Sequence, residues 1–369
     1  MPNILDSNYQ GKTRTVVKKL INLYKLQSEE NQILELFNAL TNECLSYPIT
    51  EKMPEFSRIC VDGTPLQFSV ALTKNQQDNY PLRYVTEICK PAMKLPSRIK
   101  ITRRRIPILL DLINATHIQS SINKMLDSLF PSSRINQDST QIGLWIGVQH
   151  QIGVPPTLKF YCNLLWRLYD PWSLINETLD LLHQSDLNKE IEKIKSTLGI
   201  LCHPIAFGIE CNAKGFGKVK LYLRGSHLSQ SSVRDYLNSL GWIDFNSVFN
   251  GFHDTFLGGL ESYYPFSVVL CLGLSSQSKD LFDFKFEIGT RNYLKDDKDV
   301  YQKIMQFGEE TSLDERPYLH MINTLSNGII SSQGLFYHDI LGIGYNPYLG
   351  SRLNIYLKPS LSQYFLECG

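Results

Sequence analysis

The stretch KVKLYLR, residues Lys218–Arg224, decides the fold because polar and aliphatic residues alternate along it. In an extended strand, successive side chains point to opposite faces. One face is aliphatic and consists of Val219, Leu221 and Leu223. The other is polar and consists of Lys218, Lys220, Tyr222 and Arg224. Because the aliphatic face needs helices to cover it, we expect the polar face to look into the interior of a closed sheet.

The same alternation returns along the chain in pairs of strand-like runs, about every 65 to 75 residues. The predicted pairs are residues 64–72 with 82–89, 141–150 with 157–165, 201–211 with 217–224, 265–274 with 281–290, and 333–344 with 352–358. The second runs place on the same inner face Arg83, Lys159, Tyr161, Asp283, Lys285, Glu287, Arg352, Asn354 and Tyr356. The first runs add Gln67, Ser69, Trp145, Gln149 and Glu210.

Helix-like segments with capping residues separate the strand pairs. Asp170 before Pro171 opens one helix and Gly199 ends another, while Ser231 and Ser312 are the predicted start signals of two later helices. We therefore expect an α+β fold: a ten-stranded antiparallel β-barrel with a polar lumen, surrounded by a ring of α-helices in repeated ααββ units. Residues 1–369 are expected to form this one domain, with N-terminal helices in residues 1–57 packing on the barrel.

Composition excludes several classes of function. Lys plus Arg (37) nearly balance Asp plus Glu (36), so no general positive field attracts nucleic acid or anionic lipid. The N-terminal segment lacks the order of a signal peptide, and the apolar run 266–274 is too short to span a bilayer. The eight cysteines show no CxxC pair and are predicted to be buried reduced thiols. We expect a cytoplasmic monomer or homodimer without nucleic-acid partners or membrane insertion.

Cations that face one another in a barrel lumen repel strongly unless an anion lies between them. A multiply charged group such as a diphosphate suits such a girdle. Tyrosine hydroxyls bind phosphate oxygens and tyrosine rings cover a cation, which fits a substrate that ionises to diphosphate and an allylic carbocation. Trp145, on the inward phase, is a candidate for stacking on an aromatic acceptor. The competing arrangement has the polar faces in solvent and an apolar lumen.

Three charged or glycine-rich motifs have structural interpretations that we favour. DDKD at residues 296–299 is typical of a helix start rather than of an Mg²⁺–diphosphate motif, because no second acidic motif accompanies it. RRR at 103–105 indicates a solvated helix start, and KGFGK at 214–218 indicates a hairpin turn. The histidines lack metal-ligand spacing, so His150 and His203 are expected in structural or surface roles.

The motifs KFYCN (159–163) and KVKLYLR (218–224) resemble the K-x-Y strands of the soluble aromatic prenyltransferases with the ABBA barrel. DGTPLQFS (62–69) and IGTRNY (288–293) narrow the resemblance to the dimethylallyltryptophan synthase branch, with a bacterial or cyanobacterial member expected. The resemblance covers roughly residues 55–358 through short motifs in shared order. It implies transfer of a dimethylallyl or geranyl group from its diphosphate to an indole, with no required metal.

The resemblance assigns roles to matching positions. Diphosphate binding falls to Arg83, Lys159, Lys218, Lys220, Lys285 and Arg352, and the cation shield to Tyr161, Tyr222 and Tyr356, with Asn354 as the alternative on the last strand. Gln67 stands where the family has a Glu that takes the indole N–H proton, and a carboxamide accepts no proton near neutral pH. Gln67 is then expected to orient the acceptor.

The proton acceptor is left open by this substitution. Glu210, Glu287, water and the released diphosphate are the alternatives. Glu287 also replaces a family Tyr, so we expect it to pair with Lys285 or to bind through Mg²⁺. Two other functions compete with indole prenylation: transfer to a phenol or tyrosine, and non-catalytic binding of a prenyl diphosphate.

Overall fold

A computed structural model describes residues 8–46, 59–60, 62–74, 79–90, 93–132, 139, 143–165, 170–275 and 281–359 of the chain. Within these residues, ten antiparallel strands form one closed barrel, in which each strand pairs with its neighbours in sequence and β1 pairs with β10. In order, the strands are β1 (Leu66–Thr73), β2 (Leu82–Thr86), β3 (Leu144–Gln151), β4 (Val154–Asn163), β5 (Cys202–Asn212), β6 (Gly215–Gly225), β7 (Val268–Leu274), β8 (Leu281–Gly289), β9 (His338–Asn346) and β10 (Gly350–Leu357). The predicted barrel is confirmed.

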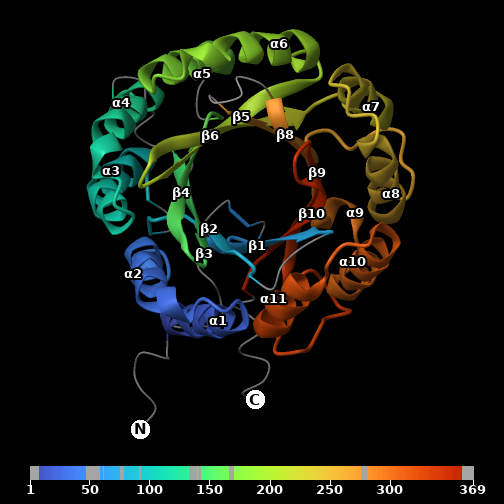
Figure 1. Cartoon of the computed structure of the whole chain (residues 1–369), viewed down its shortest axis with the longest axis horizontal. Coiled ribbons are helices and arrows are strands. Elements are labelled where there is room, and N and C mark those ends of the chain that lie inside the picture. The colour runs from blue at the N-terminus through green and yellow to red at the C-terminus, as the bar shows by residue number, and fades with distance from the viewer. Residues whose placement is uncertain are drawn as a thin grey trace.

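Two helices precede the first strand hairpin, two or three lie between successive hairpins, and together they form a ring around the barrel (Figure 1). They are α1 (Tyr9–Leu23), α2 (Glu30–Thr41), α3 (Leu95–Leu112), α4 (Gln119–Leu129), α5 (Pro171–Leu181), α6 (Asn188–Leu198), α7 (Gln230–Ser239), α8 (Phe245–Leu257), α9 (Thr290–Tyr293), α10 (Asp297–Thr311) and α11 (Arg316–Ser326). None of these helices combines the length and apolar character that crossing a membrane requires.

The aliphatic and aromatic faces of the strands pack on the helices, as the alternation predicts. On β6, Val219, Leu221 and Leu223 have no exposed surface. On β8, the Phe286 ring makes an edge contact at 5.4 Å with Phe249 of α8. On the N-terminal side, Phe37 of α2 meets Tyr84 of β2 with ring centroids 5.5 Å apart. The hydrophobic core is therefore a cylinder between sheet and helices, and the polar faces turn inward.

Some predicted boundaries were wrong for local reasons. The helix expected to begin at Ser231 begins at Gln230, because the side chain of Ser229 caps it by accepting from the N–H of Ser232. Ser312 starts no helix: it ends α10 in a left-handed conformation with φ of 55°. The segment from Gln333 joins no strand until His338, because Asp297 binds the N–H of Phe336 just before β9.

The charged and glycine-rich motifs take structural roles. DDKD starts α10, where the Asp296 side chain accepts from the N–H of Asp299. Of KGFGK, Lys214 lies in the hairpin turn between β5 and β6, and the remaining four residues begin β6. RRR lies in the middle of α3 rather than at a helix start, and Arg103 and Arg105 make ion pairs with Asp127 and Glu43. The described cysteines are all buried and unpaired with one another.

Candidate active site

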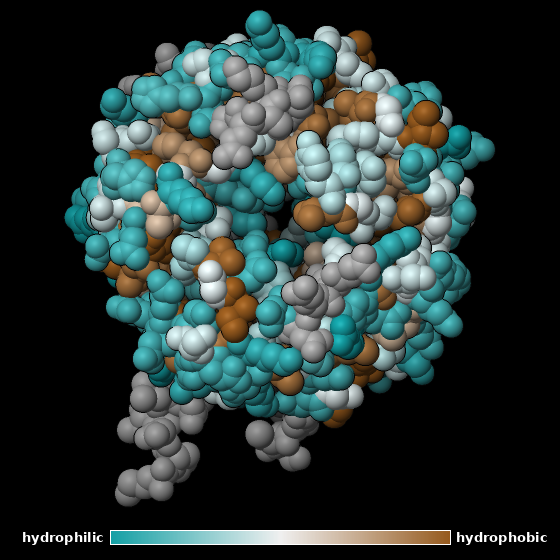
Figure 2. All heavy atoms as spheres, in the orientation of Figure 1, coloured by the Kyte–Doolittle hydropathy of each residue, from teal (hydrophilic) through white to brown (hydrophobic). Residues whose placement is uncertain are grey.

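The barrel encloses a lumen cavity of about 450 Å³. Eight predicted site residues line it: Gln67, Arg83, Trp145, Lys159, Tyr161, Tyr222, Glu287 and Tyr356. Viewed down the barrel, the molecule is hollowed at its centre, and hydrophilic residues gather around the opening (Figure 2). The lumen is therefore polar, and the alternative with an apolar lumen and solvated polar faces is wrong.

One group of lumen cations converges on a single carboxylate. Oε1 of Glu210 on β5 lies 3.1 Å from Nζ of Lys159 on β4 and 3.0 Å from Nζ of Lys220 on β6. Arg83 on β2 joins them through Gln149 of β3, whose side-chain oxygen accepts from Arg83 Nε at 3.2 Å and from Lys159 Nζ at 3.4 Å. Consecutive hairpins thus bring three cations from three strands to one side of the lumen.

The electrostatics of this group follow from burial and shared partners. Burial and the neighbouring charges of Lys220 and Arg83 lower the pKa of Lys159 to about 7, against the smaller opposing effect of Glu210. Burial disfavours the charged form of Glu210, but Lys220 and Lys159 together outweigh it and lower the pKa of the carboxyl. A carboxylate with a lowered pKa is a weak base, so Glu210 is better suited to neutralise the two lysines than to remove a proton.

A second group joins β8 and β10. Nζ of Lys285 contacts Glu287 and lies 2.5 Å from the hydroxyl of Tyr356, which in turn donates to Glu287 at 2.6 Å. The ammonium also lies 5.2 Å from the centroid of the Tyr356 ring. The expected pairing of Glu287 with Lys285 is therefore present. No cluster of three or more His, Cys, Asp or Glu in the described part of the chain is arranged for a metal ion.

Two tyrosines form an aromatic wall beside the first cation group. The rings of Tyr161 on β4 and Tyr222 on β6 meet edge to face with centroids 5.8 Å apart. Glycines on the neighbouring strands make room for them: a Cβ on Gly147 or Gly208 would lie 3.0 Å from the Tyr161 ring. Burial raises the pKa of both phenols, so they stay protonated and can donate hydrogen bonds.

The remaining predicted positions separate into inner and outer ones. Arg352 on β10 makes an ion pair with Asp283 on β8. Burial lowers the pKa of Arg83, and the nearby charge of Arg352 lowers it further. Asn354 donates to the carbonyl of Gly342. Lys218 is exposed at the barrel rim, where its Nζ lies 4.8 Å from the centroid of Phe282, so the structure does not bring it into the cation groups.

The inner charges leave a positive surplus. In the contact groups described above, the cations are Arg83, Lys159, Lys220, Lys285 and Arg352, and the carboxylates are Glu210, Glu287 and Asp283. These groups carry an excess of two positive charges when Lys159 is protonated, and an anionic ligand would neutralise that excess and favour the protonated lysine. Trp145 also lines the cavity, and no described group accepts from its indole N–H.

Two residues near the predicted site received no role from the sequence. Arg224, whose inward phase in KVKLYLR was predicted, lines the cavity, and no described group accepts from its Nε. Asp339, on β9, accepts a hydrogen bond of 2.6 Å from Nε2 of Gln67. No periodic signal could have found Asp339, because it lies at an irregularity of β9 where the strand register shifts.

No protein-family profile and no curated protein matches this sequence. Solved structures do match over nearly the whole chain. PriB in a complex with product diphosphate has a TM-score of 0.77 at 16% identity, covering 96% of this chain and 97% of its own. The fold is the barrel of the indole prenyltransferases.

Two further barrels of this kind were solved with two ligands bound. The 5-dimethylallyltryptophan synthase of Streptomyces coelicolor, in complex with DMASPP and Trp, matches with a TM-score of 0.76 and 16% identity over 96% of each chain. The 6-dimethylallyltryptophan synthase of Micromonospora olivasterospora, with the same two ligands, matches with 0.77 and 14% over 96% of this chain and 98% of its own. At these identities the likeness establishes the PT-barrel fold.

Proposed function

We propose that this protein is an aromatic prenyltransferase, which moves a dimethylallyl or geranyl group from its diphosphate to an indole-containing acceptor. The observation that carries the proposal is the surplus of largely buried cations beside a tyrosine wall, inside a closed β-barrel. Tryptophan and a dimethylallyl diphosphate analogue occupy two solved barrels of the same fold, which supports the same substrate classes here.

Lys220, Lys159 and Arg83 are the proposed diphosphate ligands on one wall, with Lys285 and Arg352 on the other. Their charges stabilise the diphosphate that leaves when the allylic C–O bond breaks and its electron pair passes to oxygen. Because Glu210 and Gln149 hold the first three cations in place before the donor binds, little reorganisation accompanies ionisation. These cations supply the charge that Mg²⁺ would otherwise provide, so Mg²⁺ is optional in this proposal.

Tyr161, Tyr222 and Tyr356 are the proposed shield of the allylic cation. Their ring faces attract a cation, and the enclosed lumen keeps water from it. An aromatic carbon then forms the new C–C bond, and the proton on that carbon leaves to the released diphosphate. Trp145 offers a ring on which the acceptor can stack.

The test is incubation of the protein with dimethylallyl or geranyl diphosphate and a panel of indoles and phenols, followed by mass spectrometry of the products. We expect prenylated indoles. Products formed only from phenols would redirect the proposal to a phenol prenyltransferase. Intact donor bound in the barrel, with no product from any acceptor, would contradict enzymatic transfer and leave a binding protein.

A further inference from the structure

Asp339 lies on β9 where the pairing with β10 is irregular. Tyr356 of β10 pairs with Ile340, but the next residue, Leu357, pairs with His338. Asp339 is therefore an extra residue in β9, a β-bulge that redirects side chains. The His338 side chain has no exposed surface and bonds to helices outside the barrel, whereas Ile340 lines the lumen. Because of the bulge, the Asp339 side chain does not follow the strict alternation between the helix-covered face, where His338 lies, and the lumen face, where Ile340 lies.

The bulge brings the Asp339 carboxylate to Gln67 of β1, on the far side of β10. Nε2 of Gln67 donates to Oδ2 of Asp339 at 2.6 Å, and the two side chains are only 4% and 3% exposed. A carboxylate accepts and does not donate, so only the nitrogen of the amide can face it. The amide oxygen of Gln67 is thereby left as the group that this lumen-lining side chain offers to a ligand.

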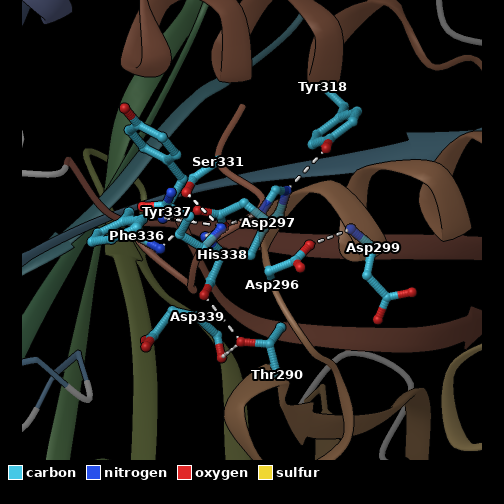
Figure 3. A network of polar contacts seen from close by, with 11 residues as sticks. Thr290, Asp296, Asp297, Asp299, Tyr318, Ser331, Phe336, Tyr337, His338 and Asp339 are labelled. Atoms are coloured by element: carbon cyan, nitrogen blue, oxygen red, sulfur yellow. Dashed lines mark hydrogen bonds and ion pairs between the residues drawn. The ribbon is translucent and has the colours of Figure 1, made fainter. Parts of the chain in front are cut away.

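The backbone around Asp339 is held by a buried polar network at the start of β9 (Figure 3). Asp297, in the first turn of α10, contacts Nδ1 of His338 at 2.7 Å and accepts from its backbone N–H at 3.1 Å. Asp297 also accepts from the backbone N–H groups of Phe336 and Tyr337. Both Asp297 and His338 have no exposed surface, so this contact ties the strand start rigidly to α10.

Two further helices complete the anchorage. The hydroxyl of Tyr318 on α11 lies 2.9 Å from Nε2 of His338. Oγ1 of Thr290, the first residue of α9, donates to the carbonyls of His338 and Asp339, both at 3.0 Å. Figure 3 shows these contacts on one side of the β9 backbone and the Asp339 side chain on another. The carboxylate is therefore placed by three helices as well as by the bulge.

Asp339 also borders a space next to the lumen. A second cavity, of about 340 Å³, has Asp339 and Cys60 in its wall and shares Ile59, Val269, Glu287 and Ile340 with the lumen cavity. Burial and the nearby charge of Asp339 raise the pKa of the Cys60 thiol, so Cys60 remains a neutral neighbour. The carboxylate thus stands at the junction of two cavities.

We propose that Asp339 fixes the orientation of the Gln67 amide, the group expected to orient the acceptor, so that the two residues form the recognition pair for the acceptor; this inference rests on the proposed function. The amide oxygen of Gln67 accepts a hydrogen bond from the N–H or O–H group on the reacting aromatic ring. Asp339 is a positioning residue that holds the amide in this orientation. Its negative charge also stabilises the positive charge that the ring acquires when its carbon attacks the allylic cation.

The pair defines a substrate class: aromatic rings that carry a free N–H or O–H donor. A methyl group on the ring nitrogen would leave the buried amide oxygen without its partner, and an unpaired buried polar group reduces transition-state binding. We expect kcat/KM for an indole to exceed that for its N-methyl analogue by about tenfold or more, which corresponds to one hydrogen bond of ordinary strength.

The experiment measures this preference in the unchanged protein and in Asp339→Asn, with dimethylallyl diphosphate as donor. An Asn side chain can donate to Gln67, so the amide can turn and lose its fixed orientation. The ratio of kcat/KM for indole to that for 1-methylindole should fall toward one, while the affinity for dimethylallyl thiolodiphosphate stays unchanged. Loss of fold alone would lower both rates and leave the ratio unchanged.

Two further variants keep the test decisive. Gln67→Glu with Asp339→Asn exchanges the carboxylate and the amide, preserves the net charge and the hydrogen bond between them, and should restore the preference. Gln67→Glu alone would place two carboxylates in contact, which is unfavourable. Gln67→Met removes the amide but leaves Asp339, and should lose the preference as Asp339→Asn does.

Calorimetric titration separates this inference from the proposed function. Indole and 1-methylindole are titrated into the protein saturated with dimethylallyl thiolodiphosphate, so that binding is read without turnover. Absence of products with an intact N–H preference in binding would refute the enzymatic proposal only. Asp339→Asn and Gln67→Met with the same preference as the unchanged protein, in binding and in rate, would overturn the recognition pair.

Discussion

Nζ of Lys220 on β6 lies 3.0 Å from Oε1 of Glu210 on the neighbouring strand β5, and both side chains are largely enclosed in the lumen. Glu210 also contacts Lys159, so one carboxylate is shared by two ammonium groups. A single negative charge does not neutralise two positive ones. A diphosphate oxygen placed between the lysines would supply the second negative charge, which is why this group dominates our account of donor binding.

Lys220→Ala should therefore weaken the donor site severely. We expect kcat to fall on the order of 10²-fold, the usual consequence of removing one group that stabilises developing charge. Lys218→Ala on the same strand is the matched comparison, because Lys218 is exposed at the rim and lies over Phe282. Steady-state kinetics with dimethylallyl diphosphate give both numbers. Equal losses in the two variants would contradict the assignment of Lys220 to the diphosphate.

Donor affinity should depend on pH through Lys159. Its pKa in the free protein is lowered to about 7, so at pH 8 the side chain is mostly neutral and at pH 6 mostly charged. A bound diphosphate favours the charged form, so binding at pH 8 should take up a proton and affinity should decline as pH rises above 7. Calorimetry of a thiolodiphosphate analogue in buffers of different ionisation enthalpy measures this uptake.

Lys159→Met is the control for the proton uptake, because the diphosphate itself also titrates. The variant should lose the part of the uptake that belongs to the lysine and keep the part that belongs to the ligand. Identical uptake in both proteins would show that Lys159 does not change its protonation when the donor binds.

Gly208→Ala should expose the carbocation to water. The new Cβ would lie 3.0 Å from the Tyr161 ring, which must then move from its place against Tyr222. We expect a larger fraction of donor to be hydrolysed to the prenyl alcohol, at the expense of prenylated acceptor. Gly241→Ala serves for comparison, since its Cβ would meet nothing within 4 Å, although its φ of 74° makes some loss of stability there expected. An unchanged ratio of alcohol to product would remove Tyr161 from the shield.

The strand phase could be predicted from the sequence because each hairpin repeats the same two-residue period. That period placed Lys159, Tyr161 and Lys220 inside the barrel, where the structure has them. The same period also counted Lys218 among the inward-facing cations, although Lys218 is exposed. Periodicity identifies the face of a strand but does not show where along the strand exposure to solvent begins. The closed order of strands then decides which cations meet.

The acceptor side could not be predicted in the same way. Asp339 reaches Gln67 through a bulge, which breaks the period on which the prediction depends. Ser231 and Ser312 show a related limit, because serine favours helix starts without fixing which serine is used. The helix near Ser231 is capped by Ser229 instead, and Ser312 ends α10 rather than starting a helix. Local irregularities, rather than the repeat, distinguish this barrel from a uniform one.

Glu287→Gln should strengthen donor binding and lower the stability of the protein that has no donor bound. Glu287 holds Lys285, whose ammonium also contacts Tyr356, so removing the carboxylate charge leaves Lys285 buried with only a neutral partner. We expect the melting temperature without ligand to fall and the stabilisation by a thiolodiphosphate analogue to grow. Thermal unfolding with and without the analogue gives both values. A variant whose ligand-induced stabilisation is smaller would indicate that Glu287 aids donor binding, for example through Mg²⁺.

Asp297→Asn tests how much the contacts that anchor the start of β9 contribute to the stability of the fold. Asp297 and His338 have no exposed surface, and the carboxylate accepts from the His338 side chain and from consecutive backbone N–H groups. Hydrogen bonds to a charged acceptor typically contribute about 1.5 to 3 kcal/mol each, so we expect the free energy of unfolding to fall by at least about 1.5 kcal/mol. An amide can accept at its oxygen only, so part of this network is lost. Denaturant unfolding measures the difference in the free energy of unfolding.

Asp299→Asn on the same helix is the matched control for that measurement. Asp299 is partly exposed: its carboxylate lies 4.0 Å from Lys303 and accepts an exposed hydrogen bond from the N–H of Lys295, which the oxygen of an asparagine can still accept, so its substitution should change stability by less than about 1 kcal/mol. If the network also fixes Asp339, Asp297→Asn should reduce the preference for indole over 1-methylindole at temperatures where the variant is fully folded. A folded variant with unchanged preference would confine Asp297 to a structural role and leave the bulge alone responsible for placing Asp339.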